Sequence, residues 1–175
     1  MPLELTTEIT RIAHQIVRTG QTDTESLTKA AAHISRSFEV NPAEVAVFSL
    51  SKDGKHLRFV VPEKLQQVGS IPLTSMSSLA ARTARERRPE IINHFSVVPH
   101  ASVFEAVKLD DAPGDPIQKI MSVPLIFQKK VVGVIQVSRK ARTSHAAGPD
   151  FTPQELKDLI AVSELLAPCV SLCSE

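Results

Sequence analysis

The sequence predicts a single domain of α+β fold spanning residues 1–175. Amphipathic helical patterns lie at both ends of the chain, and two β-hairpin patterns lie between them. A chain of 175 residues is about one domain long, and a domain of this size buries roughly 70% of the surface that its unfolded chain exposes. The chain shows no internal repeat, so one sizeable core is expected.

Residues 1–40 are predicted to form two helices before any strand. Apolar residues recur at helical spacing from Leu5 onward, and Gly20 is a natural stop for the first helix. The segment 22–25, Thr-Asp-Thr-Glu, offers a capping box for the second helix. Its apolar stripe continues until Asn41-Pro42 ends it.

The first hairpin pattern pairs residues 45–50 with residues 57–61 around a turn that contains Gly54. Alternation along the first strand places Phe48 and Leu50 on one face. The second strand alternates apolar with polar residues, so it is expected to lie toward an edge of the sheet.

A helix, a short strand and a long loop are predicted between the two hairpins. The helix runs from Ser75 to Arg88 with an Ala-Leu inner face and an Arg-rich outer face, and Pro89 stops it. Residues 90–93 form the short strand. About two dozen residues then precede the next strand, a loop length that is usually functional or disordered in a compact domain; within it, residues 101–107 are predicted to form a brief helix.

The strongest strand signal is the second hairpin pattern, residues 119–140, with its polar turn at residues 128–130. Its second strand is apolar on both faces, with Val131, Ile135 and Val137 assigned to one side, so the hairpin is expected in the middle of the sheet. Gly133 is expected to allow a close approach of another backbone or a helix. Pro124 is expected at a bulge bordering a pocket.

Residues 152–173 are predicted to form the last helix. Thr152, Pro153 and Glu155 suit its N-cap, first and third positions, and Pro168 is expected to kink it. The two cysteines, Cys169 and Cys173, lie four residues apart and share a face of this helix. We interpret them as small buried or interfacial residues, with a metal pair or a redox switch as the alternative.

Composition excludes several classes of partner. Twenty basic and nineteen acidic residues give a formal net charge of +1, and Trp and Tyr are absent, so we expect no nucleic-acid partner. No stretch approaches the ~18 apolar residues of a membrane span and no secretory signal is visible, so a cytoplasmic protein without membrane attachment is expected.

The cluster of four arginines at residues 82–88 fits a solvated helix face or, as an alternative, a site for phosphate or an acidic partner.

Three segments together resemble the GAF domain family. These are Ile71-Pro-Leu with the helix and short strand that follow it, the central strands Ser122-Val-Pro-Leu and Val132-Gly-Val-Ile-Gln-Val, and the start of the last helix at Phe151-Thr-Pro-Gln-Glu. The resemblance covers nearly the whole chain. It implies a PAS-related, twisted antiparallel sheet with the N- and C-terminal helices on one face, and with a loop and short helices over a ligand pocket on the other.

The resemblance also places candidate pocket residues. A mostly apolar lining with a few polar groups is typical of small-ligand sites. The alternative is that the apolar members only fill core and the serines only cap helices. The candidate ligand-binding residues are Phe48, Ser75, Leu79, His94, Phe104 and Ser122.

The sequence gives little indication of a cofactor site or a catalytic site. His94 and His100 are the candidates for metal or haem ligation, but the other histidines lack ligand spacing, so neither group is expected. Bilin-binding members and the methionine-sulfoxide-reducing branch of the family both use pocket cysteines, whereas here both cysteines sit at the end of the last helix. No covalent bilin is therefore expected, and no catalytic residue is assigned.

These observations predict a non-catalytic sensory or regulatory module that binds an unidentified small molecule. The first and last helices carry apolar stripes, so we expect a homodimer through them and output to a signalling protein partner. The alternatives are an interaction or scaffold protein with a filled pocket and, with less support, an enzyme of the same fold.

Overall fold

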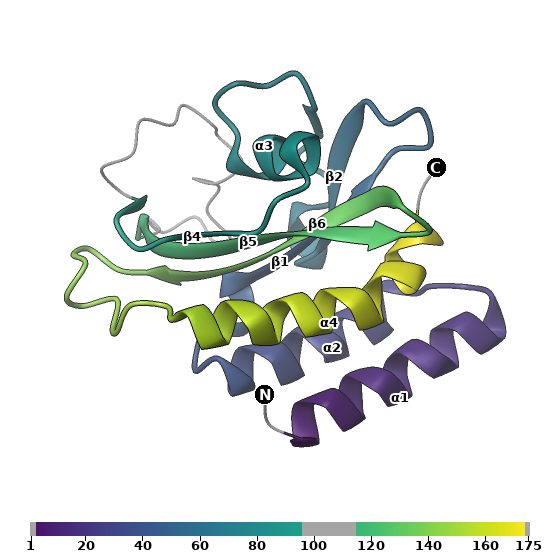
Figure 1. The fold of residues 1–175 in the computed structure, drawn as a ribbon, viewed down its shortest axis with the longest axis horizontal. Coiled ribbons are helices and arrows are strands. Elements are labelled where there is room, and N and C mark those ends of the chain that lie inside the picture. Colours follow the sequence, from purple (N-terminus) through teal and green to yellow (C-terminus); the bar gives the residue numbers. More distant parts are fainter. Residues whose placement is uncertain (1–2, 96–114, 174–175) are drawn as a thin grey trace.

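The computed structural model describes residues 3–95 and 115–173, and in these residues six antiparallel strands form one sheet (Figure 1). The strand order is β3-β2-β1-β6-β5-β4. The strands are β1 (Val45–Leu50), β2 (His56–Val61), β3 (Ser70–Pro72), β4 (Glu90–Ile92), β5 (Ile117–Phe127) and β6 (Lys130–Lys140).

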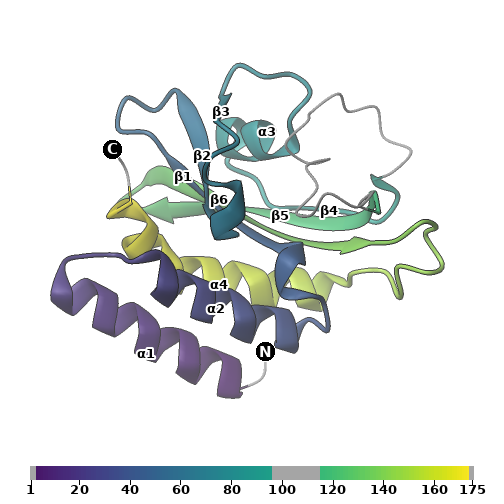
Figure 2. The same ribbon diagram turned by 180° about the vertical axis from the view of Figure 1, so that it is seen from behind.

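Helices cover both faces of the sheet, as Figures 1 and 2 show from opposite sides. On one face, α2 (Thr24–Ser37) and α4 (Pro153–Ser171) pack on the strands, and α1 (Leu3–Thr19) packs against both of these helices. On the other face, α3 (Leu79–Glu86) packs on β5 and β6. Two short 3₁₀ helices, η1 (Pro42–Glu44) and η2 (Glu63–Leu65), flank the first hairpin. The predicted α+β arrangement, with the terminal helices on one face, is confirmed.

The second hairpin lies in the middle of the sheet, as predicted. Strand β6 pairs with β1 on one side and with β5 on the other, and the three-residue strand β4 covers the outer side of β5. The turn is shorter than expected, because only Gln128 and Lys129 separate the strands. Both have positive φ, 52° and 66°, the combination that a two-residue type I′ turn requires.

Gly133 makes the close approach that was expected of it. A Cβ atom at this position would lie 2.0 Å from the carbonyl oxygen of Phe48 and 3.0 Å from Cγ1 of Val170 in α4. Real Cβ atoms do not approach backbone oxygens this closely, so only glycine fits between β1 and α4.

The predicted facing of Val131 is wrong. The ladder between β5 and β6 shifts register between Leu125 and Ile126, and such a slip moves the following side chains to the opposite face. Val131 therefore packs on the α3 side of the sheet, while Ile135 packs under α4. Pro124 lies next to this irregularity, past the last residue of β5 that β4 pairs, where a missing N–H is tolerated.

Two predicted helix starts are displaced. Helix α3 begins after Ser78, whose hydroxyl accepts from the amide of Ala81, and not at Ser75. Helix α2 is capped by Asp23, whose carboxylate accepts from the Ser26 amide at 2.6 Å. In place of the expected cap, the hydroxyl of Thr22 donates to the carbonyl of Cys169 at 2.7 Å, tying the α1–α2 turn to α4.

The sheet divides the interior into cores on its two faces. The apolar stripe of α1 is buried in the core on the α2 and α4 side, so it is used within the chain; its members are Leu5, Ile9, Ile12, Ala13 and Ile16. None of the helices in the described ranges is long and apolar enough to span a membrane. The predicted helix at residues 101–107 lies outside the described residues.

Candidate functional site

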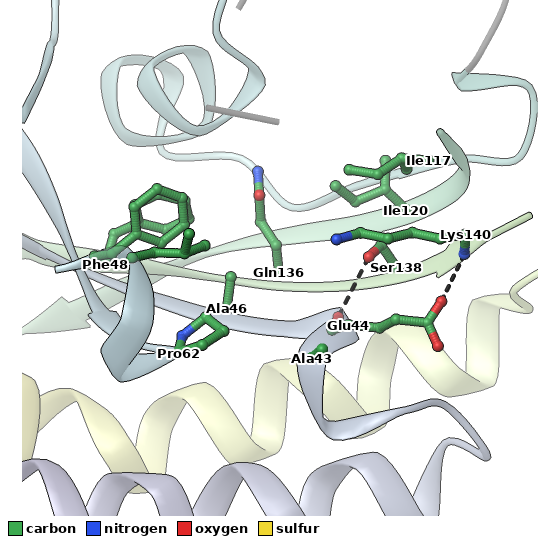
Figure 3. Close-up of a pocket in the computed structure, with 12 residues that line it drawn as sticks. Ala43, Glu44, Ala46, Phe48, Pro62, Ile117, Ile120, Gln136, Ser138 and Lys140 are labelled. Atoms are coloured by element: carbon green, nitrogen blue, oxygen red, sulfur yellow. Dashed lines mark hydrogen bonds between the residues drawn. The ribbon is translucent and has the colours of Figure 1, made fainter. Parts of the chain in front are cut away.

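A small pocket lies on the face of the sheet that α2 and α4 leave uncovered (Figure 3). Its volume is about 30 Å³. Strands β1, β2, β5 and β6, the two 3₁₀ helices and the N-cap residue of η2 supply the described residues that line it: Ala43, Glu44, Ala46, Phe48, Phe59, Pro62, Leu65, Ile117, Ile120, Gln136, Ser138 and Lys140.

The polar part of the lining comes from one strand. Gln136, Ser138 and Lys140 occupy every second position of β6 and so share the pocket face, whereas Ile135 and Val137 at the alternate positions enter the core on the other face. Strand β6 is central, so its side chains are screened from water on both sides. The pocket therefore has a polar row in a largely apolar surround.

Glu44 fixes the end of this polar row. Its carboxylate accepts the backbone amide of Asn41 at 2.8 Å and the backbone amide of Lys140 at 2.6 Å. The carbonyl of Glu44 in turn accepts the hydroxyl of Ser138 at 3.3 Å. Both carboxylate oxygens are thus committed to the backbone, and η1 is held against the end of β6.

The side chain of Lys140 reaches back over the pocket. Figure 3 shows it lying along the sheet with its ammonium above Ser138, directed toward Gln136. No hydrogen bond or ion pair joins this ammonium to another described residue. Burial lowers the pKa of Lys140, and the nearby carboxylate of Glu44 opposes this effect.

A buried polar network lies beside the pocket, under α3. The hydroxyls of Ser122 and Thr83 are 2.7 Å apart, and Gln136 donates its amide to Ser122 at 3.2 Å. The hydroxyl of Thr83 also reaches the carbonyl of Leu79 at 2.9 Å. Helix α3 thus sits directly on β5 and β6, with the hydroxyl of Thr83 paired above the sheet, and leaves no space at Ser122.

The structure distributes the sequence-predicted site residues over several environments. Phe48 lines the pocket. Leu79 packs with Ile120, a pocket residue, in a separate apolar cluster, and Ser122 touches the pocket only through Gln136. Ser75 lies in the turn before α3, and its carbonyl accepts from Arg85.

The remaining two candidates are His94 and Phe104. His94 is exposed and does not line the pocket. Phe104 and His100 lie outside the described residues. Pro124, expected at the border of a pocket, does not line this one either.

Sequence reasoning missed Glu44, Gln136, Ser138 and Lys140. A readable signal existed for three of them, because polar residues at every second position of an otherwise apolar central strand mark one face as different from the other. Glu44 carried no such signal, since its role depends on how β1 pairs with β6.

The comparisons with known proteins agree with this geometry. The family model described as GAF domain matches residues 21–170. The chain belongs to the GAF domain family. Among solved structures, the GAF domain from Acinetobacter phosphoenolpyruvate-protein phosphotransferase is similar with a TM-score of 0.66 and 15% identity, over 98% of this chain and 95% of that one.

Two further solved structures show the same fold. Residues 122 to 287 of a methyl-accepting chemotaxis protein match with a TM-score of 0.65 and 12% identity, over 91% of this chain and 94% of that one. A type II free methionine-R-sulfoxide reductase from Thermoplasma acidophilum matches with a TM-score of 0.57 and 19% identity, over 85% and 95%. No curated protein matches the sequence.

The cysteines of this GAF domain lie on the helical side of the sheet, away from the pocket. The thiol of Cys169 is fully buried and 3.8 Å from the carbonyl of Ala13 in α1, and that of Cys173 is 3.9 Å from the carbonyl of Cys169. Burial raises the pKa of Cys169 to about 11, so this thiol is a poor nucleophile at neutral pH. Within residues 3–95 and 115–173, no three His, Cys, Asp or Glu side chains group as metal ligands.

The arginine cluster at residues 82–88, at the C-terminal end of α3, is engaged within the chain. Arg82 pairs with Glu90 at 2.9 Å and Arg88 with Glu86 at 2.9 Å. Arg85 donates to the carbonyl of Ser75 at 2.6 Å, and Arg87 to that of Lys129 at 2.8 Å. These contacts favour the structural interpretation of the cluster over a phosphate site.

Proposed function

We propose that this GAF domain is a non-catalytic sensory or regulatory module that binds a small molecule in the pocket on the sheet. GAF domains are generally ligand-binding modules of this kind, which supports the class. The observation that carries the proposal is the pocket lining, where apolar side chains surround the ammonium of Lys140, which has no protein partner among the described residues. Apolar walls with a few oriented polar groups are what small-ligand sites need.

Strand β6 offers a route from the pocket to the helices. Its residues alternate between the pocket, where Gln136 and Ser138 lie, and the core under α4, where Ile135 and Val137 lie. Packed cores respond to a displaced strand as a unit, because they contain few voids. A ligand that shifts β6 would therefore change the packing of α4, and a partner protein at the helical side would receive the signal.

Self-association through the helical side belongs to the same proposal. The stripe of α1 is buried within the chain, so the first helix contributes little beyond exposed Val17 and Leu3. The outer side of α4 keeps partly exposed apolar residues, ending at exposed Leu172. A homodimer would thus use mainly α4, and light scattering at micromolar concentration tests it: a monomeric mass counts against it.

The ligand proposal is tested by thermal unfolding in the presence of a library of small metabolites. A ligand at about 100 times its Kd stabilises the folded state by roughly 2.7 kcal/mol, which raises Tm by several degrees. The variant Ala46→Leu places a larger side chain at the pocket and should abolish the shift. The control Ala161→Leu makes the same exchange on α4, outside the pocket, and should keep it.

The second candidate function is an interaction protein whose pocket is closed. The observation that favours it is the small volume of the pocket, about 30 Å³. Cavities that hold drug-sized ligands have volumes of ~300–1,000 Å³, measured with more generous boundaries. This candidate function predicts that no library member raises Tm in the wild-type chain. A catalytic role has less support, because the reductase neighbour shares the fold alone and neither cysteine of this chain lines the pocket.

A further inference from the structure

The pocket differs from a generic apolar cavity in its electrostatics. Lys140 is the only lysine or arginine among the described residues that line it, and Glu44 is the only acid. The two carboxylate oxygens of Glu44 accept backbone amides, so Glu44 does not hold the ammonium in an ion pair. None of the residues in 3–95 and 115–173 thus occupies the three N–H donors of Lys140, which a ligand could use.

A partly buried ammonium that no described residue pairs favours an anion. Taking a charge out of water is costly unless a counter-charge accompanies it, and hydrogen bonds between charged groups are roughly twice as strong as neutral ones. The lowered pKa of Lys140, which burial causes, reports the same unrelieved desolvation. A bound anion would remove this cost.

The charge and size of the pocket narrow the class of anion. The single positive charge of Lys140 matches a monoanion, whereas a phosphate dianion would place a second, uncompensated negative charge near the carboxylate of Glu44. The volume of about 30 Å³ has room for two or three water-sized groups, at roughly 10–15 Å³ for each. The ligand therefore has few heavy atoms and a charge of −1.

The walls next to Lys140 favour an apolar tail. Ile117 is the register partner of Lys140 across the β5–β6 ladder, and Ile120 lines the pocket on the same strand. Beyond Gln136 the floor continues into Ala46 and Phe48. A ligand whose anionic end meets the ammonium would lay its other end against these side chains.

We propose that the pocket selects a small carboxylate with a short aliphatic tail, held at its charged end by Lys140. This inference rests on the proposed function, since it assumes that the pocket is a ligand site. It adds the chemical class of the ligand and the residue that selects it.

Propionate and its neutral amide, propionamide, form a matched pair of probes. We would titrate the isotope-labelled chain with each and follow the backbone amide signals of Gln136, Ser138 and Lys140 by NMR. Propionate is expected to shift these signals with an affinity at least about tenfold above that of propionamide, the ratio that one charged hydrogen bond supplies.

Two lysine variants assign the selectivity to one side chain. Lys140→Met keeps the apolar stem and removes the charge, and it should bring propionate down to the affinity of propionamide. Lys130→Met makes the same exchange at the exposed start of β6 and should leave both affinities unchanged. A dispersed NMR spectrum of each variant verifies its fold.

The outcomes separate this inference from the proposed function. Equal affinities of the two probes, or a preference for propionate that survives Lys140→Met, would overturn the carboxylate inference. If propionate fails to bind while a neutral library member raises Tm in the wild type but not in Ala46→Leu, the inference falls and the ligand pocket stands. If no compound acts at the pocket, both fall.

Discussion

Gly133 and Phe48 are packed so closely that a Cβ atom on Gly133 would lie 2.0 Å from the carbonyl oxygen of Phe48. This contact fixes β1 against β6 beside the pocket and lets α4 lie on the sheet. We expect Gly133→Ala to destabilise the fold by about 3 kcal/mol or more, because a backbone oxygen cannot yield as a flexible side chain does. Urea unfolding measures this.

Gly54→Ala is the control for Gly133→Ala. Gly54 has a φ of +72° and no atom within 4 Å of an added Cβ, so only backbone strain of about 1–2 kcal/mol is expected there. Equal unfolding midpoints for the two variants would contradict the close packing of β1 on β6.

The pair Ser122 and Thr83 should behave as one unit. Ser122→Ala leaves the side-chain amide of Gln136 without its partner, at an expected cost of about 1–3 kcal/mol. Thr83→Val removes the other hydroxyl of the network. In a double-mutant cycle, the double variant should be destabilised by at least about 0.5 kcal/mol less than the sum of the two single variants. Strict additivity would show that the 2.7 Å contact contributes nothing.

Arg139 should not tolerate lysine. Its guanidinium, buried in the core, donates to the carbonyls of Pro149 at 2.6 Å and Phe38 at 3.0 Å and lies 4.1 Å from the ring centre of Phe151. An ammonium is a point charge and cannot keep this planar arrangement, so Arg139→Lys is expected to cost about 1–3 kcal/mol in denaturant unfolding. Arg142→Lys, at an exposed position, should stay within about 0.5 kcal/mol of wild type.

The cysteine thiols should ionise only at high pH in the folded chain. Burial raises the pKa of Cys169 from the ordinary 9.0 to about 11 and also raises the pKa of Cys173. The chain has no Tyr or Trp, so the ultraviolet absorbance of the thiolate follows their ionisation directly. We expect the folded chain to titrate well above the urea-unfolded chain, and coincident curves would contradict the burial of these thiols.

The raised pKa of Cys169 should also make the free energy of unfolding depend on pH. A thiol whose pKa is higher in the folded state contributes stability below its unfolded pKa and loses it as pH rises through the folded value. Between pH 9 and about 11 the free energy of unfolding should therefore fall faster in the wild type than in Cys169→Ala. Parallel pH profiles would show that Cys169 ionises equally in both states.

Local patterns predicted much of the fold. The paired apolar runs of the second hairpin and the capping box at Thr152 are contained within short segments, and the structure has both. The facing of Val131 was mispredicted because a register shift leaves no mark in the sequence of one strand.

Most of the pocket residues could not be predicted from the sequence, for a related reason. Glu44 and Lys140 lie 96 residues apart and meet only through the pairing of β1 with β6. Phe48, which family resemblance placed at a pocket, does line it. Ser122 was placed at a pocket by family resemblance, whereas Thr83, a helix residue with no distinguishing pattern, fills the space above it.

The proposed function requires that a small molecule binds on the sheet at the polar row of β6. The most direct measurement is an NMR titration of the wild-type chain with the compound that raises Tm most, recording which backbone amides shift. We expect shifts centred on Ala46, Gln136, Ser138 and Lys140, all of them lost in Ala46→Leu. Shifts confined to α1 and α4, or unchanged by Ala46→Leu, would contradict the proposed function.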